Sequence, residues 1–228
     1  MRFLSLVFKD SKFSVYIRDD ADESVMAEIF KHHEYRAVEN IIKETAETIV
    51  DVGAHAGFFI LYARVLNKKA PILAIEPEKE NLSVLNRHIK ENKIHKVKII
   101  EGALAEKTGQ GNLLISKDNH NHRLVDVAPP DAAVLPVTTF SLSDILTKIK
   151  SIGLLKMDIE GSEFKVLKSL KPKDFKVIKA IIMEYHENFG SHKDLEKILR
   201  ENGFGVQIFP SKFDKTMGFI FANNKGIK

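Results

Sequence analysis

The pattern of apolar and polar positions divides the chain into a short lead-in and a longer regular region. The lead-in covers residues 1–46, and the regular region covers residues 47–228. The elements expected in the lead-in are a β-hairpin of residues 3–8 and 12–17, a helix through Phe30 that Asp22 would cap, and a helix from about Glu34 to Glu44. We therefore expect two structural units, of which the first is small.

From residue 47 onward, short apolar runs of strand length alternate with segments of helical period. The expected strands are residues 48–52, 71–75, 96–101, 152–157 and 177–183. The expected helices between them fall near residues 57–66, 78–91, 141–149 and 162–170. Short apolar strands that alternate with helices indicate a parallel sheet covered by helices on both faces.

The two ends of this regular region differ from its middle. A helix is expected near residues 191–201, and two apolar runs at 206–209 and 217–221 predict a terminal hairpin. Residues 105–137 show no helical period, and they predict one strand from Asn112 to Ser116 and a mobile loop. The predicted fold class is α/β, with a doubly wound, mostly parallel sheet that ends in a C-terminal antiparallel hairpin.

Composition and charge exclude several classes of protein. The 228 residues are 44% hydrophobic and 29% charged, with no cysteine and a formal net charge of +4. Disulfides and thiol chemistry are therefore excluded. The apolar start meets Lys9 too early for a signal peptide, and no run approaches the roughly 20 apolar residues of a membrane span. We expect a soluble, cytoplasmic protein without a membrane partner.

A glycine turn follows the first strand of the regular region. The residues expected to bind a cofactor there are Asp51, Gly53, Ala54, Gly57 and Phe58. Gly53 would allow a sharp turn with positive φ, and Gly57 would let helix and ligand pack closely. Free N–H groups at the helix start would face a carboxylate or phosphate. The spacing D-x-G-x-x-x-G differs from the dinucleotide pattern G-x-G-x-x-G, which favours S-adenosylmethionine (SAM) over NAD.

The next two strands end in residues suited to the rest of such a cofactor. Glu76 lies 19 residues after the second glycine of the turn, where an acidic side chain can accept both ribose hydroxyls. Pro77 suits the start of the following helix. Gly102 and Ala103 are small enough for an adenine ring to lie against the backbone. Glu101 would either bond to the adenine amino group or face solvent.

A cluster of charged residues ends the fourth strand of the regular region. It consists of Lys156, Asp158, Glu160 and Glu163. Such a cluster is costly to bury unless its members pair, bind a ligand or face a cleft. Alternation places Lys156, Asp158 and Glu160 on one side of the strand. The cluster therefore predicts either an active site or a structural Lys–Asp pair with Glu163 at a helix N-terminus.

Three histidines complete the set of candidate residues. His186 follows the fifth strand beside Glu184, where it is either a general base or a histidine of a surface loop. His120 and His122 lie in the predicted mobile loop, where they could bind a metal or contact an acceptor. No third ligand stands out in the sequence, so no metal site is predicted.

Taken together, these residues resemble the FkbM family of SAM-dependent methyltransferases. The motifs that carry the resemblance are Asp51 to Phe59, Glu76-Pro77, Lys156 to Glu163, and Glu184 with His186, preceded by a lead-in from Asp22 to Tyr35. The resemblance implies a class I, Rossmann-like methyltransferase with SAM as its cofactor. It also implies O-methylation, often of hydroxyls on sugars or other natural products.

Within that resemblance, the charged residues receive provisional roles. Asp158 or His186 would take the proton of the acceptor hydroxyl, while Glu160 and Glu163 would orient the acceptor. Lys156 would pair with Asp158 or stabilise a developing alkoxide. A divalent cation held by Asp158 and a neighbouring carboxylate is a further option.

The sequence also permits other functions. An RNA methyltransferase, such as one acting on tRNA, would suit the positive net charge, but lysine and glutamate are interspersed rather than gathered in a basic stripe. A non-catalytic SAM-binding module would have no need for the charged cluster. The expected acceptor is therefore a small molecule with a hydroxyl group, with nucleic acid as the less favoured partner.

Overall fold

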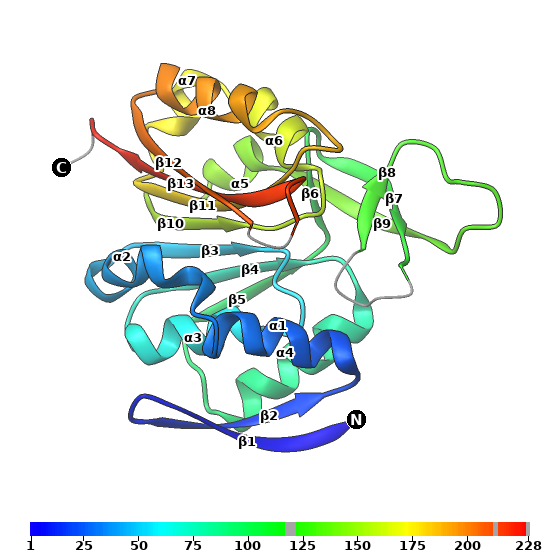
Figure 1. Cartoon of the computed structure of the whole chain (residues 1–228), viewed down its shortest axis with the longest axis vertical. Helices are drawn as coiled ribbons and strands as arrows, with labels where there is room; N and C mark the ends of the chain where they lie inside the picture. Colours follow the sequence, from blue (N-terminus) through cyan, green and yellow to red (C-terminus); the bar gives the residue numbers. More distant parts are fainter. Residues whose placement is uncertain (117–121, 212–213, 227–228) are drawn as a thin grey trace.

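A seven-stranded sheet organises the fold of the chain (Figure 1). The computed structural model describes residues 1–116, 122–211 and 214–226. In spatial order, the strands are β12 (Phe204–Pro210), β13 (Met217–Asn224), β11 (Ala180–His186), β10 (Ile152–Met157), β3 (Thr48–Val52), β4 (Ile72–Glu76) and β5 (Val97–Glu101). Strands β5, β4, β3, β10 and β11 are parallel, whereas β13 is antiparallel to both of its neighbours. The predicted doubly wound sheet with a terminal hairpin is confirmed.

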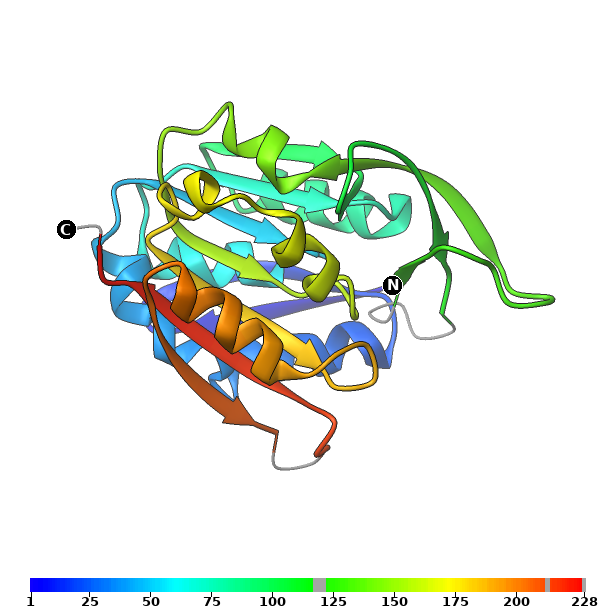
Figure 2. The ribbon, with the colours of Figure 1, turned by 90° about the horizontal axis from the view of Figure 1, so that it is seen from above.

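Helices cover both faces of this sheet (Figures 1 and 2). One face carries α1 (Asp20–Phe30), the 3₁₀ helix η1 (Glu34–Val38), α2 (Glu39–Glu44), α3 (Phe58–Leu66) and α4 (Lys79–Glu91). The other carries α5 (Leu142–Leu146), α6 (Glu163–Ser169), α7 (Pro172–Phe175) and α8 (His192–Glu201). Strand side chains alternate between the faces, so Ile49 joins one apolar core and Val50 the other. Burial of both strand faces explains their continuous apolar sequences.

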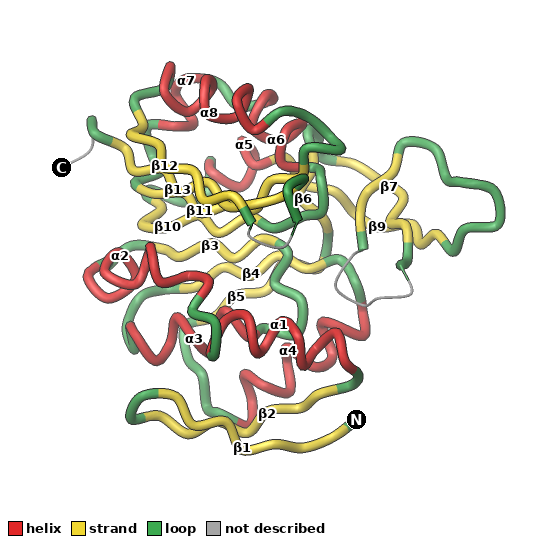
Figure 3. The backbone as a smooth tube through the Cα atoms, in the orientation of Figure 1, coloured by secondary structure: helices red, strands yellow, loops and turns green. Residues whose placement is uncertain are grey.

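The N-terminal hairpin lies outside the helix layer, against α4 (Figure 3). Its strands are β1 (Arg2–Phe8) and β2 (Ser11–Ile17), as the sequence predicts. The side chain of Asn92 fastens the hairpin, because it donates to the Ser14 carbonyl at 2.8 Å and accepts the Ser14 N–H at 2.7 Å. The lead-in residues therefore pack directly on the sheet-bearing part of the chain.

The predicted cap of α1 is wrong. Asp19, not Asp22, is the N-cap, and its side chain accepts the Asp22 N–H at 3.1 Å. Asp22 lies in the first turn, where it is fully buried and paired with Arg18. Both aspartates are good capping residues, and the side chain of Asp22 is instead held by Arg18, four residues earlier in the sequence. The second expected helix is also divided, into η1 and α2.

A second, four-stranded sheet projects beyond the carboxyl edge of the central sheet (Figure 1). It contains β6 (Ala103–Ala105), β9 (Val134–Ser141), β7 (Gly109–Leu114) and β8 (Arg123–Val125) in that order. The sequence predicted a single strand and a loop here. These strands carry few buried apolar residues, so their periodicity is weak, and backbone pairing with one another defines them.

The helices in the described ranges lack the combination of length and apolar character that a membrane-spanning helix needs.

The division of the chain into a lead-in of residues 1–46 and a second unit of residues 47–228 stays a prediction.

Candidate active site

A cavity of about 960 Å³ opens at the carboxyl ends of the parallel strands. Its walls include the loops after β3, β4, β5, β10 and β11, together with the start of η1 and the turn side of the β12–β13 hairpin. The chain leaves β3 toward β4 and β10 toward β11, so the direction of winding reverses between these two adjacent strands. Ligands of open α/β sheets bind at such a switch point.

The glycine turn after β3 has the left-handed backbone that its sequence predicts. Gly53 has φ of +69° and Gly57 has φ of +85°, while the intervening His55 has φ of +50°. The N–H groups of Gly53 and Ala54 both donate to the Ile75 carbonyl, at 3.0 and 3.1 Å. The N–H groups of Gly53 and Ala54 are therefore already bonded within the protein. The N–H groups in the first turn of α3 have no acceptor within the helix, so this turn is the part of the motif that can donate to a ligand.

Two residues of the predicted cofactor site lie behind the cavity wall. Gly57 does not line the cavity, and a Cβ atom there would lie 3.1 Å from the Leu85 side chain of α4. Its small size serves helix packing rather than ligand approach. Asp51 is also absent from the lining and is fully buried. In contrast, Ala54 and Phe58 do line the cavity.

Glu76 is a buried carboxylate that faces the cavity. Its Oε2 accepts the His55 N–H at 2.8 Å, and its Oε1 accepts from the Glu78 N–H at 3.0 Å and the Asn81 Nδ2 at 3.1 Å. Burial raises the pKa of Glu76, although these donors oppose the shift. A carboxylate oxygen can accept two hydrogen bonds, so Oε2 retains capacity for a ligand hydroxyl.

Lys156 joins the charged cluster to the glycine turn. Its Nζ donates to the carbonyls of Gly53 at 2.8 Å and Val52 at 3.3 Å. The same atom lies 3.3 Å from Asp51 Oδ1 and 3.8 Å from Asp158 Oδ2. Burial opposes its charge, but the two carboxylates raise the pKa of Lys156 overall. The structural Lys–Asp pair is therefore present, and its shorter contact is to Asp51, the cross-strand neighbour.

The side of the cavity formed by the ends of β10 and β11 is rich in carboxyl groups. Met157 at the end of β10 pairs with Met183 of β11, so Asp158 and Glu184, the next residues of the two segments, are neighbours. Burial and the neighbouring Asp158 raise the pKa of Glu184. Burial likewise raises the pKa of Glu34 to about 8. These shifts indicate that some of the carboxyl groups keep a proton near pH 7 and can donate hydrogen bonds.

His186 lies among these carboxyl groups, with 14% of its side chain exposed. Its Nε2 is 3.4 Å from Glu160 Oε2 and 3.8 Å from Glu184 Oε2. Burial lowers the pKa of His186, although Asp158 opposes the shift, so the ring is neutral near pH 7. Within the described part of the chain, its buried Nδ1 has no hydrogen-bond partner. The alternative of a histidine in a surface loop is wrong.

The loop after β10 is held by Glu163. Glu160 has φ of +54° and Gly161 has φ of +96°, both in the left-handed region. The fully buried Glu163 carboxylate accepts the N–H groups of Ile159 at 2.9 Å and Gly161 at 2.8 Å. Glu160 lines the cavity, whereas Glu163 does not. The expected contact of Glu163 with an acceptor is therefore corrected to support of the loop that carries Glu160.

The other predicted residues divide into two groups. Pro77, Gly102 and Ala103 line the cavity, whereas Glu101 is exposed and lies outside its lining. His122 also lines the cavity, and its Nδ1 accepts the Ser116 N–H at 3.1 Å.

His120 lies outside the described residues. Among the described residues, no three histidine, aspartate or glutamate side chains are grouped as ligands for a metal.

The sequence interpretation missed cavity residues that come from distant segments. Glu34 and Tyr35 of η1 reach the cavity from the lead-in, and Phe209 and Gly218 reach it from the terminal hairpin. His55 was overlooked although it lies inside the glycine motif. No periodicity marks these positions, because their neighbours are set by packing between elements far apart in sequence.

The cavity has a charge opposite to that of the whole chain. Among the described lining residues, only Lys156 carries an ammonium or guanidinium group. The lining carboxyl side chains are Glu28, Glu34, Glu76, Asp158, Glu160, Glu184 and Asp214. Such a lining disfavours a phosphate or another strongly anionic group in the cavity.

Comparisons with known proteins identify a matching family model and similar proteins. Residues 51–206 match the family model of the methyltransferase FkbM domain. The chain is 27% identical over 190 residues to methyltransferase sdnD of Sordaria araneosa, covering 69% of this chain and 73% of that protein. It is 23% identical over 191 residues to 31-O-demethyl-FK506 methyltransferase FkbM of Streptomyces tacrolimicus, covering 70% of this chain and 73% of that protein.

A solved structure shares the fold. Methyltransferase FkbM from Methylobacillus flagellatus superposes with a TM-score of 0.53 at 19% identity. The alignment covers 78% of this chain and 43% of that one, so this chain spans less than half of that protein. At this identity, the similarity concerns the fold alone.

Proposed function

The chain belongs to the FkbM family of SAM-dependent methyltransferases, and on that premise we propose that it methylates a hydroxyl group of a sugar or another small molecule. One observation carries the proposal: the neutral imidazole of His186 lies in the cavity among carboxyl groups. A neutral imidazole can accept a hydroxyl proton, and carboxyl groups can bind neighbouring hydroxyls. The O-methyltransferase named among the relatives supports the same reaction class.

The residues present fit SAM on one side of the cavity. Glu76 offers a buried acceptor for ribose hydroxyls, and Gly102 and Ala103 offer small side chains for a flat adenine ring. The start of α3 at Phe58 faces the cavity and suits a carboxylate. Gly53 contributes through the turn that positions these groups. The volume of about 960 Å³ leaves the acceptor side, around Asp158 and His186, for a second molecule.

Bound SAM would supply a reactive methyl group on a positively charged sulfur, so the protein chiefly has to align the acceptor and remove its proton. We assign removal of the acceptor's hydroxyl proton to His186, with Asp158 as the alternative base. Glu160 and Glu184 would orient the acceptor through hydrogen bonds. Lys156 would hold the turn and balance the charge of Asp51 and Asp158, because its ammonium already has carbonyl and carboxylate partners.

The two alternative functions, methylation of a nucleic acid and SAM binding without catalysis, make different demands on the cavity. A nucleic-acid acceptor would bring phosphates toward a lining with a single lysine, which is unfavourable. A non-catalytic binding module would gain nothing from several carboxyl groups with raised pKa values beside a buried histidine. Both observations support a catalytic site for an acceptor that is not an anion.

Calorimetric titration with SAM, followed by a labelled-methyl screen, tests the proposal. The screen should contain sugars, small hydroxyl compounds and tRNA, each at low and high salt. We expect SAM to bind and label to enter hydroxyl compounds. Absence of SAM binding at millimolar concentration would contradict the cofactor assignment, while label in tRNA alone would contradict the acceptor class.

Replacement of Glu76 with glutamine is expected to raise the dissociation constant for SAM about tenfold, because a charged acceptor for a ribose hydroxyl is lost. Calorimetry measures this change directly. Glu101→Gln is the matched control, since Glu101 ends the neighbouring strand but lies outside the cavity. Equal losses in both variants would contradict the assignment of Glu76 to the ribose.

The rate of methyl transfer should fall as pH decreases through the pKa of His186. Burial lowers that pKa, so the midpoint should lie below the ordinary value of 6.5. Protonation removes the lone pair that accepts the hydroxyl proton, so activity is present above the midpoint and lost below it. Initial rates at saturating SAM between pH 4.5 and 7 measure the effect. A midpoint above 6.5 would argue against His186 as the base.

A further inference from the structure

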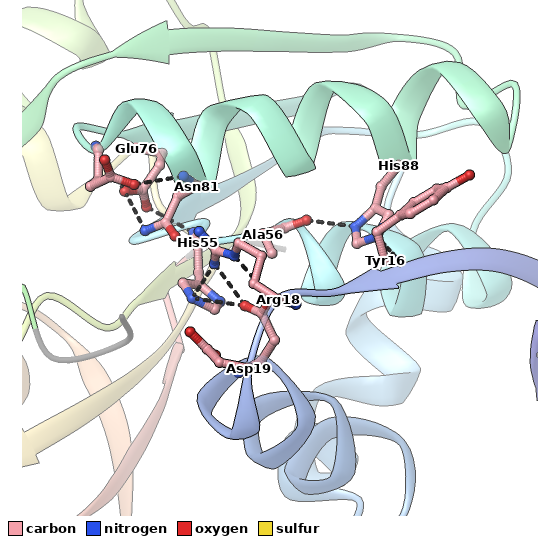
Figure 4. A network of polar contacts seen from close by, with 10 residues as sticks. Tyr16, Arg18, Asp19, His55, Ala56, Glu76, Asn81 and His88 are labelled. Atoms are coloured by element: carbon pink, nitrogen blue, oxygen red, sulfur yellow. Dashed lines mark hydrogen bonds and ion pairs between the residues drawn. The ribbon is translucent and has the colours of Figure 1, made fainter. Parts of the chain in front are cut away.

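The side chain of His55 points away from the sheet toward the lead-in, into a polar network (Figure 4). Its Nε2 lies 3.2 Å from Arg18 Nη2 and 3.5 Å from Asp22 Oδ1. A guanidinium can only donate, so a hydrogen bond between these two nitrogen atoms requires Nε2 as its acceptor. The tip of the glycine turn is therefore tied to residues that precede the family-matched region, 51–206.

Arg18 and Asp22 form a rigid support for this ring. The guanidinium donates from Nε and Nη2 to the two oxygens of Asp22, at 2.9 and 2.7 Å. The Arg18 backbone N–H donates to Asp22 at 2.7 Å as well. Asp22 is fully buried, and 11% of the Arg18 side chain is exposed. A two-point contact between buried charged groups has little freedom to reorient.

A second histidine, His88, connects Ala56 of the glycine turn to Tyr16 of β2. His88 Nε2 accepts the Tyr16 N–H at 2.8 Å, so its Nδ1–H donates to the Ala56 carbonyl at 2.8 Å. His88 is 1% exposed, and burial lowers its pKa, which keeps the ring neutral as this arrangement requires. Figure 4 shows Tyr16 and Arg18 approaching the turn from the same strand end.

These contacts bear on Glu76 through the backbone of His55. The His55 N–H is a donor to Glu76, and His55 has the positive φ that side chains other than glycine rarely adopt. The turn therefore needs outside contacts to keep this donor in place. The ring contacts with Arg18 and Asp22 supply them.

We propose that His55, Arg18 and Asp22 are positioning residues for SAM, and that the N-terminal hairpin and α1 thereby form part of the cofactor site. They act through the glycine turn, which presents Glu76 to the ribose. The inference rests on the proposed placement of SAM in the cavity.

Three full-length variants test the inference by calorimetric titration with SAM. Asp22→Asn removes the charge that holds Arg18, and it is expected to raise the dissociation constant about tenfold. His55→Gly removes the ring while relieving the positive φ, so it tests the contact without adding backbone strain. Glu23→Gln is the matched control, because Glu23 is the next residue of α1 and pairs with Arg2 on the exposed surface. It should bind SAM as the wild type does.

Amide hydrogen exchange without SAM provides a readout that is independent of binding. Residues 53–57 should exchange faster in Asp22→Asn and His55→Gly than in the wild type, while the Glu23→Gln protein should match the wild type. A simple loss of global stability would instead accelerate exchange throughout β3 and β10.

The outcomes separate this inference from the proposed function. Wild-type affinity and wild-type exchange in both Asp22→Asn and His55→Gly would overturn the positioning role while leaving the methyltransferase site intact. If His55→Gly bound SAM as tightly as the wild type or more tightly, a flexible glycine would be sufficient at this position. That result would also overturn the positioning role of His55. Absence of SAM binding by the wild-type protein would instead contradict the cofactor placement itself.

Discussion

Replacement of Gly53 with alanine is expected to cost roughly 3 kcal/mol of unfolding free energy and to abolish SAM binding. A Cβ atom at this position would lie 1.8 Å from the Asp158 carbonyl oxygen, and φ is +69°. The obstacle is backbone at the end of the neighbouring strand, so no side-chain rotation can relieve it. Urea denaturation measures the stability change, and calorimetry measures SAM binding.

Gly109→Ala is the control for this prediction. Gly109 lies on β7, and the nearest atom to an added Cβ is Thr139 Oγ1 at 4.0 Å. Its unfolding free energy should change by less than about 0.5 kcal/mol. If Gly53→Ala were as stable as Gly109→Ala, the close packing of the turn on the β10 loop would be incorrect.

Replacement of His186 with glutamine is expected to reduce kcat by about 10²–10⁴-fold at saturating SAM, because the general base is lost. Glutamine keeps hydrogen-bonding capacity and similar size, so the SAM dissociation constant should stay within about twofold of the wild type. Single-turnover rates with an acceptor from the labelled-methyl screen measure the chemical step.

His192→Gln is the matched control for this second prediction. His192 also contacts a glutamate, Glu187, but it lies at the start of α8 and outside the cavity lining. Its kcat should equal that of the wild type. A His186→Gln protein with wild-type kcat would remove His186 from the chemistry, and Asp158→Asn would then be expected to show the loss.

Buried parallel strands were the part of the fold that the sequence predicted best. The bounds of β3 and β10, Thr48–Val52 and Ile152–Met157, coincide with the predicted ranges. Each strand is covered on both faces, so it appears as a continuous apolar run that charged or glycine residues terminate. The small sheet of β6 to β9 carries no such signal, because its strands depend on one another for pairing.

The helix termini show a second limit of prediction. Asp19 and Asp22 are both suitable N-caps, and local sequence alone favours neither strongly. Asp22 is withdrawn from capping by the buried contact with Arg18. Arg18 lies only four residues before Asp22, so this ion pair is local in sequence, and the tertiary structure buries it and brings it to His55.

The sequence by itself determined the turn after β3 and the strand ends that carry Glu76, Asp158 and His186. Parallel strands in a doubly wound sheet bring their carboxyl ends to one edge, so residue order is sufficient to place these side chains near a common cleft. The family and the methyl donor follow from the same motifs.

Only the tertiary structure decided which charged residues face the cavity and which support its walls. Strand periodicity fixes the face on which a side chain lies, but its depth depends on the elements packed against it. Hence Asp51 and Glu163 lie behind the wall and Glu101 lies outside it. Glu34 and Arg18 join the site region from the lead-in, because packing of distant segments has no signature in local sequence.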